Sequence, residues 1–251
     1  MSSTIVLITG ANSGVGLATA KAIASASEEF HVIMAGRSVE KVKAAMSEIE
    51  TTGVKGSLST VQLDVTDEES IRQATKSVQE KHGRLDVLVN NAAVGSMDPD
   101  IKTRLQLSMD TNVIGPAVVA AAFRPLLFKA QKPYSIYVSS GVGSLTKAAT
   151  KPTSLSYRRL PGEEAYRASK AALNMIAVLE AMEFGSKGLK VFAMCPGFVV
   201  SNLRGTDDKA RSGWGNAGDP MVSGKTVLSI IQGERDADAG KFVHKDGVYP
   251  W

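Results

Sequence analysis

Short apolar runs rich in β-branched residues alternate with longer segments of helical periodicity along the whole chain. The runs expected to be strands cover residues 4–9, 31–35, 58–65, 84–92, 134–140, 190–195 and 240–245, and the expected helices cover 13–27, 38–50, 67–81, 101–130, 163–185 and 219–233. Thr66, with Glu69 three residues later, is expected to cap the helix of 67–81. Such alternation places helices on both faces of one sheet. The sequence therefore predicts a single α/β domain over 1–251, with a doubly wound, mostly or fully parallel sheet of seven strands.

The amino-acid composition argues against nucleic acid, a membrane and a metal ion as partners. Lys and Arg exceed Asp and Glu by only four, and they are scattered rather than clustered, so we expect no nucleic-acid partner. The one cysteine, Cys195, excludes an intramolecular disulfide and is compatible with a reducing compartment. No apolar stretch approaches the roughly 18 residues of a membrane span, and the first residues lack a basic leader, so we expect a cytoplasmic protein without membrane contact. His31, His82 and His244 are dispersed, which predicts no metal site.

A glycine-rich loop follows the first expected strand, in the stretch TGANSGVGLA (9–18). Gly10 can make the sharp turn, Gly14 lets the backbone approach a phosphate, and Gly16 permits close packing of helix on sheet. The amides at the start of the next helix attract an anion. Glycine triplets alone are common in turns, but this strand–loop–helix context is typical of a Rossmann-type dinucleotide-binding domain.

Further motifs follow in order, and with them the chain resembles the short-chain dehydrogenase/reductase family, in particular its carbonyl-reductase-like members. The matching segments are the T-G-x-x-x-G-x-G loop from Thr9 to Gly16, Asp64 in LDV, NNA at 90–92 with Ala93 where Gly is usual, Asn112 in TNVIG, VSSGVG at 138–143, Y-x-x-x-K at 166–170, and CPGFVVSNL at 195–203. The resemblance implies a nicotinamide cofactor bound at the carboxyl ends of the strands.

The resemblance also implies four catalytic residues. Tyr166 would exchange the proton of the reacting oxygen, and Lys170 would hold the cofactor's ribose and lower the pKa of Tyr166 together with an oxidised nicotinamide. Ser140, by register rather than Ser139, would donate a hydrogen bond to the substrate oxygen. Asn112 would hold a water that links Lys170 to solvent, the alternative being a polar residue that only bends its helix.

The cofactor contacts implied by the resemblance come from six segments. They are Gly10, Asn12, Ser13, Gly14, Val15 and Gly16 in the loop, Arg37, Ser38, Asp64 and Val65 after the second and third strands, Asn91, Ala92 and Ala93 after the fourth, the pair Tyr166 and Lys170, and Pro196, Gly197, Val199 and Ser201 after the sixth.

The end of the second expected strand favours NADP(H) over NAD(H). NAD-binding domains place Asp or Glu about 20 residues after the loop, to accept from the 2′-hydroxyl. Here the sequence reads MAGRS, with Gly36 and then Arg37 and no carboxylate. Arg37 can bind a 2′-phosphate through its fork of donors, and Ser38 can add a hydroxyl. The alternative is that Arg37 is a surface residue at the start of a helix.

Two segments are longer than the family pattern requires. Residues 145–164 look like the insertion that precedes the catalytic Tyr in carbonyl-reductase-like members, where it covers a helix surface that otherwise pairs subunits; a monomer is therefore slightly favoured over a dimer or tetramer. Residues 199–218 form a polar, Gly-rich stretch expected to be a substrate lid. The places of Tyr157, Trp214 and Trp251 are left open.

These expectations combine into a function and one alternative from another class. The sequence predicts an NADPH-dependent carbonyl reductase that transfers hydride from nicotinamide to a small ketone or aldehyde, such as an aromatic or polyketide-like ketone of secondary metabolism, and reversibly oxidises an alcohol. The alternative is an NADP(H)-sensing binding or regulatory module without turnover, although such modules usually lose the Tyr or Lys that this chain keeps.

Overall fold

The structure is a computed structural model that describes residues 3–150 and 163–251. Its sheet has the strand order β3-β2-β1-β4-β5-β6-β7-β8. The strands are β1 (Thr4–Thr9), β2 (Phe30–Gly36), β3 (Ser57–Gln62), β4 (Val87–Asn90), β5 (Tyr134–Val138), β6 (Lys190–Met194), β7 (Phe242–His244) and β8 (Gly247–Tyr249). Strands β1 to β7 pair in parallel, as a doubly wound α/β domain requires.

The predicted count of seven strands was wrong by one. An eighth strand, β8, returns antiparallel beside β7, with Val243 opposite Val248 and His244 opposite Gly247. Two residues suffice for the turn between them, and Gly247 has a φ of 156°, within the region that favours glycine. A strand of three residues is too short to show an alternating pattern, so β8 was not predictable from periodicity.

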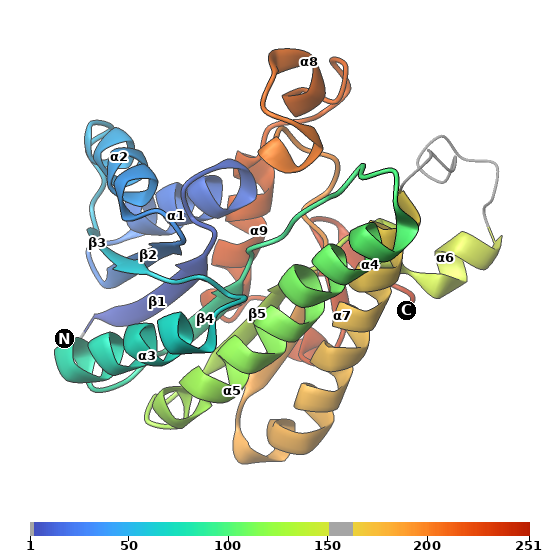
Figure 1. Ribbon diagram of the computed structural model, residues 1–251. Helices are drawn as coiled ribbons and strands as arrows, with labels where there is room; N and C mark the ends of the chain where they lie inside the picture. Colours follow the sequence, from blue (N-terminus) through green and yellow to red (C-terminus); the bar gives the residue numbers. More distant parts are fainter. Residues whose placement is uncertain (1–2, 151–162) are drawn as a thin grey trace.

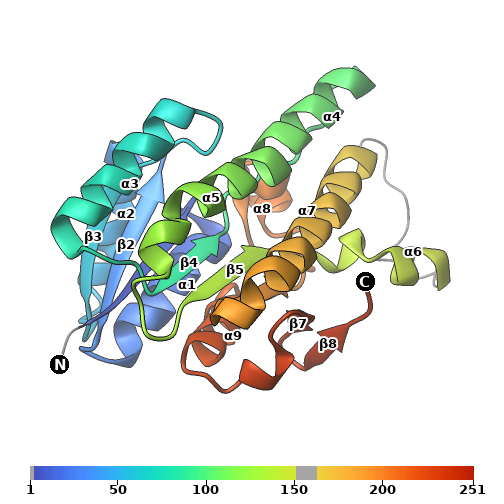
Figure 2. The ribbon, with the colours of Figure 1, turned by 90° about the horizontal axis from the view of Figure 1, so that it is seen from below.

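Helices cover both faces of the sheet (Figures 1 and 2). The longer ones are α1 (Gly14–Ala26), α2 (Val39–Glu50), α3 (Glu68–His82), α4 (Ile101–Met109), α5 (Gly115–Leu127), α7 (Glu163–Phe184) and α9 (Met221–Ile231), and the short ones are α6 (Leu145–Thr150) and α8 (Asp208–Arg211). Buried apolar side chains of α1, α2 and α9 form one core with the sheet, and those of α3, α5 and α7 form a second core on the opposite face. In the described part of the chain, no helix is both long enough and apolar enough to cross a membrane.

Two predicted helices differ locally from the expectation. The helix of 101–130 is divided by a π-helical turn, η1 (Asp110–Ile114), between α4 and α5. Helix α3 is capped by Asp67, whose side chain accepts from the Glu69 amide. The predicted cap Thr66 was therefore wrong: it lies one residue before the N-cap position, and its hydroxyl donates to Asp64 Oδ1 at 2.7 Å.

Strand order sets the position of the site. The chain moves outward from β1 to β3 and then returns to β4 on the other side of β1, so the crossovers on the two sides of β1 run in opposite directions. A crevice forms at the carboxyl ends of the strands where the order reverses. Strands β1, β4, β5 and β6 all end at this edge, so the segments that follow them begin beside the crevice.

Candidate active site

The loop between β1 and α1 is shaped by glycines. Gly10 and Gly14 have φ values of 64° and 53°, which favour glycine. A Cβ atom at Gly16 would lie 2.5 Å from the Gly10 carbonyl oxygen and 2.5 Å from Asn91 Nδ2. Asn91 Nδ2 itself donates to the carbonyl oxygens of Thr9 (2.8 Å) and Gly10 (3.1 Å), so the segment after β4 holds the loop in place. A side chain at position 16 would break this contact.

The first turn of α1 suits an anionic ligand. Ser13 occupies the N-cap position, but its side chain makes no capping hydrogen bond, and the first turn contains no acidic residue. The first N–H groups of a helix have no acceptor within the helix and carry partial positive charge. The residues present therefore fit the pyrophosphate of a dinucleotide, with the exposed amides of this turn as donors.

The end of β2 has little space for a side chain at position 36, and the next residue is a cation, Arg37, instead of the carboxylate typical of NAD-binding domains. A Cβ atom at Gly36 would lie 2.8 Å from Val42 Cγ2, so a side chain there would crowd α2. Arg37 is exposed, and its guanidinium has no hydrogen bond or ion pair with the described residues. The Ser38 hydroxyl is already engaged, because it donates to Glu40 Oε2 (2.8 Å) and accepts from the first turn of α2. Glu40 is an acidic neighbour that the sequence analysis did not weigh.

The segment after β3 places the predicted adenine-side residues. Asp64 Oδ1 accepts from the Thr66 amide (2.9 Å) and hydroxyl (2.7 Å), which fixes the carboxylate at the end of the strand. Val65 is buried, and its carbonyl oxygen lies 2.8 Å from where a Cβ atom on Gly115 would stand. In the described part of the chain, no group of three His, Cys, Asp or Glu side chains could hold a metal ion.

The two serines after β5 have different environments. Ser139 is buried, and its hydroxyl hydrogen-bonds to Asn174 Oδ1 at 2.6 Å and lies 3.3 Å from the Lys170 carbonyl oxygen. Ser140 is partly exposed, its hydroxyl accepts from the Val142 amide at 3.4 Å, and it lies close enough to the Tyr166 hydroxyl to influence the pKa of that group. The structure therefore brings Ser140, and not Ser139, together with the Tyr166 hydroxyl.

Lys170 lies one helical turn after Tyr166 on α7 and is almost completely buried. Only 2% of Lys170 is exposed, and its Nζ donates to the Val138 carbonyl oxygen at 2.8 Å. The same Nζ lies 5.6 Å from the centroid of the Tyr166 ring. Burial lowers the pKa of Lys170 from 10.5 to about 7, because a buried ammonium loses its hydration. A lysine with this pKa exchanges protons readily at neutral pH.

The expectation that the pKa of Tyr166 is lowered was wrong for the protein by itself. Burial raises the pKa of Tyr166 well above its ordinary value of 10. The neighbouring Ser140 hydroxyl and the positive charge of Arg204 act in the opposite direction, but desolvation outweighs both. The lowering by an oxidised nicotinamide stays a prediction.

Asn112 lies in the π-helical turn and connects three segments. Its Oδ1 accepts from the Val94 amide (2.8 Å), and its Nδ2 donates to the Val94 carbonyl oxygen (2.9 Å) and to Ser169 Oγ (3.0 Å). Both N–H groups of the side chain are thus used to hold the loop after β4 against α7. The role of Asn112 as a water-binding relay residue stays a prediction, and π-helical turns are often found at functional sites.

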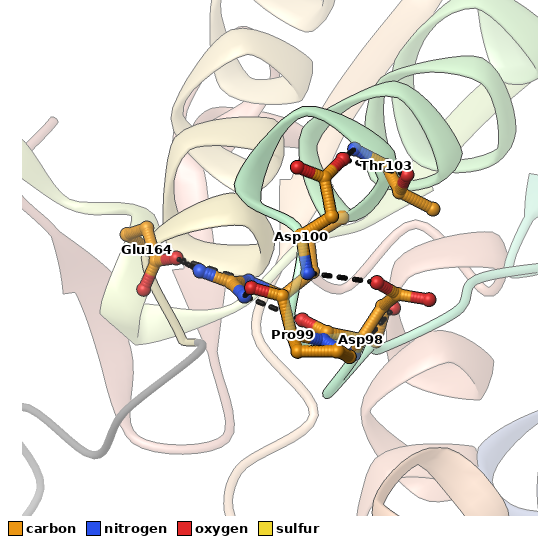
Figure 3. A network of polar contacts seen from close by, with 7 residues as sticks. Asp98, Pro99, Asp100, Thr103 and Glu164 are labelled. Carbon is orange, nitrogen blue, oxygen red and sulfur yellow. Dashed lines mark hydrogen bonds and ion pairs between the residues drawn. The ribbon is translucent and has the colours of Figure 1, made fainter.

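Arg104 on α4 connects the loop after β4 to the helix that carries Tyr166, and its partners Asp98, Pro99 and Glu164 lie together in Figure 3. Its Nε donates to Glu164 Oε1 at 3.1 Å, its Nη2 forms an ion pair with the same carboxylate, and its Nη1 donates to the carbonyl oxygens of Asp98 and Pro99. The side chains of Arg104 and Glu164 are 12% and 24% exposed, so the pair is largely shielded from water. Because Glu164 precedes Tyr166 by two residues, this pair fixes the first turn of α7.

The segment after β6 forms a loop whose ends meet. A β-bridge joins Val199 to Gly218, and the chain between them contains η5 (Asn202–Arg204) and α8. We call residues 199–218 the lid loop. Pro196 is fixed by a hydrogen bond from Ser223 Oγ to its carbonyl oxygen (2.8 Å), and Gly197 has a φ of 82°.

The lid loop lies against the phosphate-binding loop and against the loop after β4. A Cβ atom at Gly14 would lie 3.2 Å from Ser201 Cβ, and one at Gly95 would lie 3.0 Å from the Leu203 carbonyl oxygen. Residues 201–203 therefore cross from the phosphate side of the site to its opposite wall. Trp214, which the sequence could not place, is 65% exposed and has a φ of 55°.

The C-terminal residues pack beside the segment that follows Ser140. The Trp251 ring stacks on Phe242 of β7, with centroids 5.6 Å apart, and the Trp251 carbonyl oxygen accepts from the Thr146 amide at 2.9 Å. This arrangement settles the position of Trp251 at the sheet edge, against the start of the predicted insertion. Within that insertion, α6 is described, whereas Tyr157 lies outside the described residues.

Comparison with known proteins identifies the family. The family model for short chain dehydrogenases matches residues 4–212. The chain belongs to the short-chain dehydrogenase/reductase family. It is 33% identical over 254 residues to the short-chain dehydrogenase/reductase tropE of Talaromyces stipitatus, covering 96% of this chain and 95% of that protein. It is 38% identical to the short-chain dehydrogenase anuI of Penicillium roqueforti over 207 residues, which are 80% of this chain and 81% of that protein.

Solved structures share the fold over the whole chain. The crystal structure of an NADPH-bound carbonyl reductase from chicken fatty liver superposes with a TM-score of 0.80 and 27% identity, covering all of both chains. The family assignment therefore establishes this chain as a member of an oxidoreductase family. The resemblance to carbonyl-reductase-like members that the sequence indicated is confirmed.

Three residues near the site were missed by the sequence analysis. Arg104 and Arg204 are single arginines in segments without a motif, and no local pattern shows which side chains they meet. Cys195 is buried, and its Sγ accepts from the Gly141 amide at 3.1 Å, so it holds the turn after Ser140. Its position directly before Pro196, at the end of a strand that borders the site, was the available signal.

Proposed function

We propose that the protein is an NADPH-dependent carbonyl reductase, which reduces a ketone or aldehyde and reversibly oxidises the alcohol. The observation that carries this proposal is that Ser140 and Tyr166 lie together beside the buried Lys170, whose Nζ donates to the Val138 carbonyl oxygen. Bound NADPH would supply the hydride, and the protein would orient the carbonyl and supply the proton. Aromatic and polyketide-like ketones are the proposed substrates, because Val94 and the exposed ring of Phe198 provide apolar surface.

Each of the catalytic residues has a role that follows from its surroundings. Tyr166 remains protonated at neutral pH because of its raised pKa, so it can donate to an oxygen that gains negative charge. Ser140 supplies a second donor to the same oxygen. Lys170, with a pKa of about 7, can return a proton to Tyr166 after each turnover.

Cofactor choice rests on Arg37. We propose NADP(H), supported by the unpaired, exposed guanidinium of Arg37 and by Gly36, where an acidic side chain would collide with α2. The carbonyl reductase of similar fold was crystallised with NADPH. The replacement Arg37→Asp should shift the ratio of kcat/KM for NADPH and NADH towards NADH, and an unchanged ratio would contradict the assignment.

The test of the function compares the parent protein with Tyr166→Phe. NADPH oxidation is followed at 340 nm with aldehydes, diketones, quinones and polycyclic aromatic ketones, while NADPH binding is measured by fluorescence. We expect turnover with the parent and a loss of about 10²- to 10⁴-fold in the variant, with NADPH binding retained. Turnover that survives in Tyr166→Phe would refute the mechanism, and tight NADPH binding without turnover by the parent would favour the NADP(H)-sensing module.

The location and assembly of the protein remain predictions. A cytoplasmic monomer was expected from the sequence. Helix α7 exposes Met175, Leu179 and Met182 at 57%, 50% and 75%, and an apolar stripe of this kind weighs against a monomer. Sedimentation velocity distinguishes a monomer from a dimer, and Met182→Lys should shift a dimer towards the monomer.

A further inference from the structure

The lid loop contains a cation that the proposed reaction does not use. Arg204, at the end of η5, donates through Nε to the Ala210 carbonyl oxygen (3.1 Å) and through Nη2 to those of Val199 and Arg211 (both 2.9 Å). Its guanidinium lies 4.5 Å from the centroid of the Phe198 ring. Three carbonyl oxygens and one aromatic face therefore fix the guanidinium, while Nη1 makes no hydrogen bond with the described residues.

No carboxylate balances this charge. Arg204 is half-buried and forms no ion pair with the described residues, and residues 1–2 and 151–162 contain neither Asp nor Glu. Burial lowers the pKa of Arg204, since desolvation disfavours the charged form. A partly desolvated cation without a counter-charge is costly, so an anion brought to Nη1 would be stabilised.

The position of Arg204 favours the substrate end of the site over the phosphate end. Ser201 is the part of the lid loop that contacts the phosphate-binding loop, at Gly14, whereas Leu203 contacts the opposite wall at Gly95. Arg204 follows Leu203 directly. It also lies close enough to Tyr166 for each group to alter the pKa of the other.

We propose that Arg204 binds an acidic group of the substrate, and that the substrate is therefore an aryl carbonyl compound bearing a carboxylate or an ionised phenol. The exposed Phe198 ring beneath the guanidinium supplies an apolar surface for the aryl group. This inference rests on the proposed carbonyl reduction for the identity of the substrate, but the anion site itself does not depend on turnover.

The test uses pairs of carbonyl compounds that differ only in charge. The 2-, 3- and 4-formylbenzoates are compared with their methyl esters, with NADPH, for the parent protein and for Arg204→Gln, Arg204→Lys and Lys209→Gln. We expect the parent to prefer at least one acid over its ester, and Arg204→Gln to reduce that preference by about 10- to 100-fold. Arg204→Lys should retain part of the preference, and the exposed control Lys209→Gln should retain all of it.

The ratio within each pair separates recognition from damage to the lid loop, because a disordered loop would slow the acid and the ester alike. No acid preference in the parent, or an equal preference in Arg204→Gln, would overturn the proposal. A weaker NADPH affinity in Arg204→Gln, with an unchanged preference for acid over ester, would also overturn the proposal. It would assign the guanidinium to binding the cofactor's phosphates.

A binding experiment tests the anion site at Arg204 independently of the proposed reductase activity. Isothermal titration of the protein–NADPH complex compares benzoate with benzamide, for the parent and for Arg204→Gln. Binding of benzoate that depends on Arg204 supports the anion site even when no carbonyl is reduced, in which case only the reductase proposal fails. Equal binding of benzoate and benzamide by the parent refutes the site.

Discussion

The burial of Lys170 makes a prediction about stability that needs no substrate. Its ammonium has one protein acceptor, the Val138 carbonyl oxygen at 2.8 Å, and burial lowers its pKa from 10.5 to about 7. In the unfolded chain the same group has its ordinary pKa. Between these two values the unfolded state binds more protons than the folded state, so stability must rise with pH across this window.

The magnitude follows from the two pKa values. A full proton difference changes the free energy of unfolding by about 1.4 kcal/mol per pH unit. From pH 7.5 to pH 9.0 the folded protein holds Lys170 mostly neutral while the unfolded chain holds it mostly charged. Integration over this range gives a gain in stability of about 2 kcal/mol from Lys170 alone. The replacement Lys170→Met removes this contribution.

Urea unfolding followed by circular dichroism at pH 7.5 and pH 9.0 measures the effect. The parent and Lys170→Met should differ by about 2 kcal/mol in how much stability each gains between the two pH values. Lys225→Met, at an exposed position of α9, should behave as the parent does. If Lys170→Met gains as much stability as the parent, Lys170 is not desolvated in the folded protein, and its proposed role as a proton donor near neutral pH fails with it.

Two further predictions concern the packing around Tyr166. A Cβ atom at Gly143 would lie 2.7 Å from the Lys170 carbonyl carbon, so Gly143→Ala should push the Ser140 turn away from α7, cost about 1–3 kcal/mol in the free energy of unfolding and lower kcat. Gly185→Ala, where a Cβ atom meets nothing within 4 Å, is the matched control in thermal unfolding, and equal effects of the two would contradict the steric argument. Arg104→Met removes the ion pair with Glu164 and should lower kcat on the order of tenfold by misplacing the first turn of α7. Glu164→Gln keeps one hydrogen bond and should lose less, so steady-state kinetics showing the larger loss in Glu164→Gln would refute the positioning role.

The sequence predicted the frame of the fold because its signals are local. Apolar runs, glycines with positive φ and the order of motifs follow from residues near one another in the chain, and the α/β assignment agrees with the structure. The errors also have local causes. Strand β8 is too short for periodicity, and the predicted cap Thr66 was one residue too early, because α3 begins at Glu68 and Asp67 accepts from its first turn.

The polar contacts that complete the site were not predictable, because they join segments far apart in the chain. Arg104 and Glu164 are separated by 60 residues, and Asn112 and Ser169 by 57. The direction of the pKa shift of Tyr166 was not predictable from the sequence either. A lysine four residues away suggested a lowered value, but the actual direction depends on how much water the folded chain excludes, which no spacing of residues reveals.

Arg204 shows why charge in this site must be considered with its surroundings. The net charge of +4 spread along the sequence gave no reason to select one arginine in a variable loop. The structure gives that reason, because it partly buries Arg204, surrounds the guanidinium with carbonyl oxygens instead of carboxylates, and brings it near Tyr166. Backbone carbonyls fix its position but cannot neutralise it, so its charge remains available to whatever binds beside Tyr166. A cation held in this way beside Tyr166 is suited to the role proposed above, which is to select the substrate.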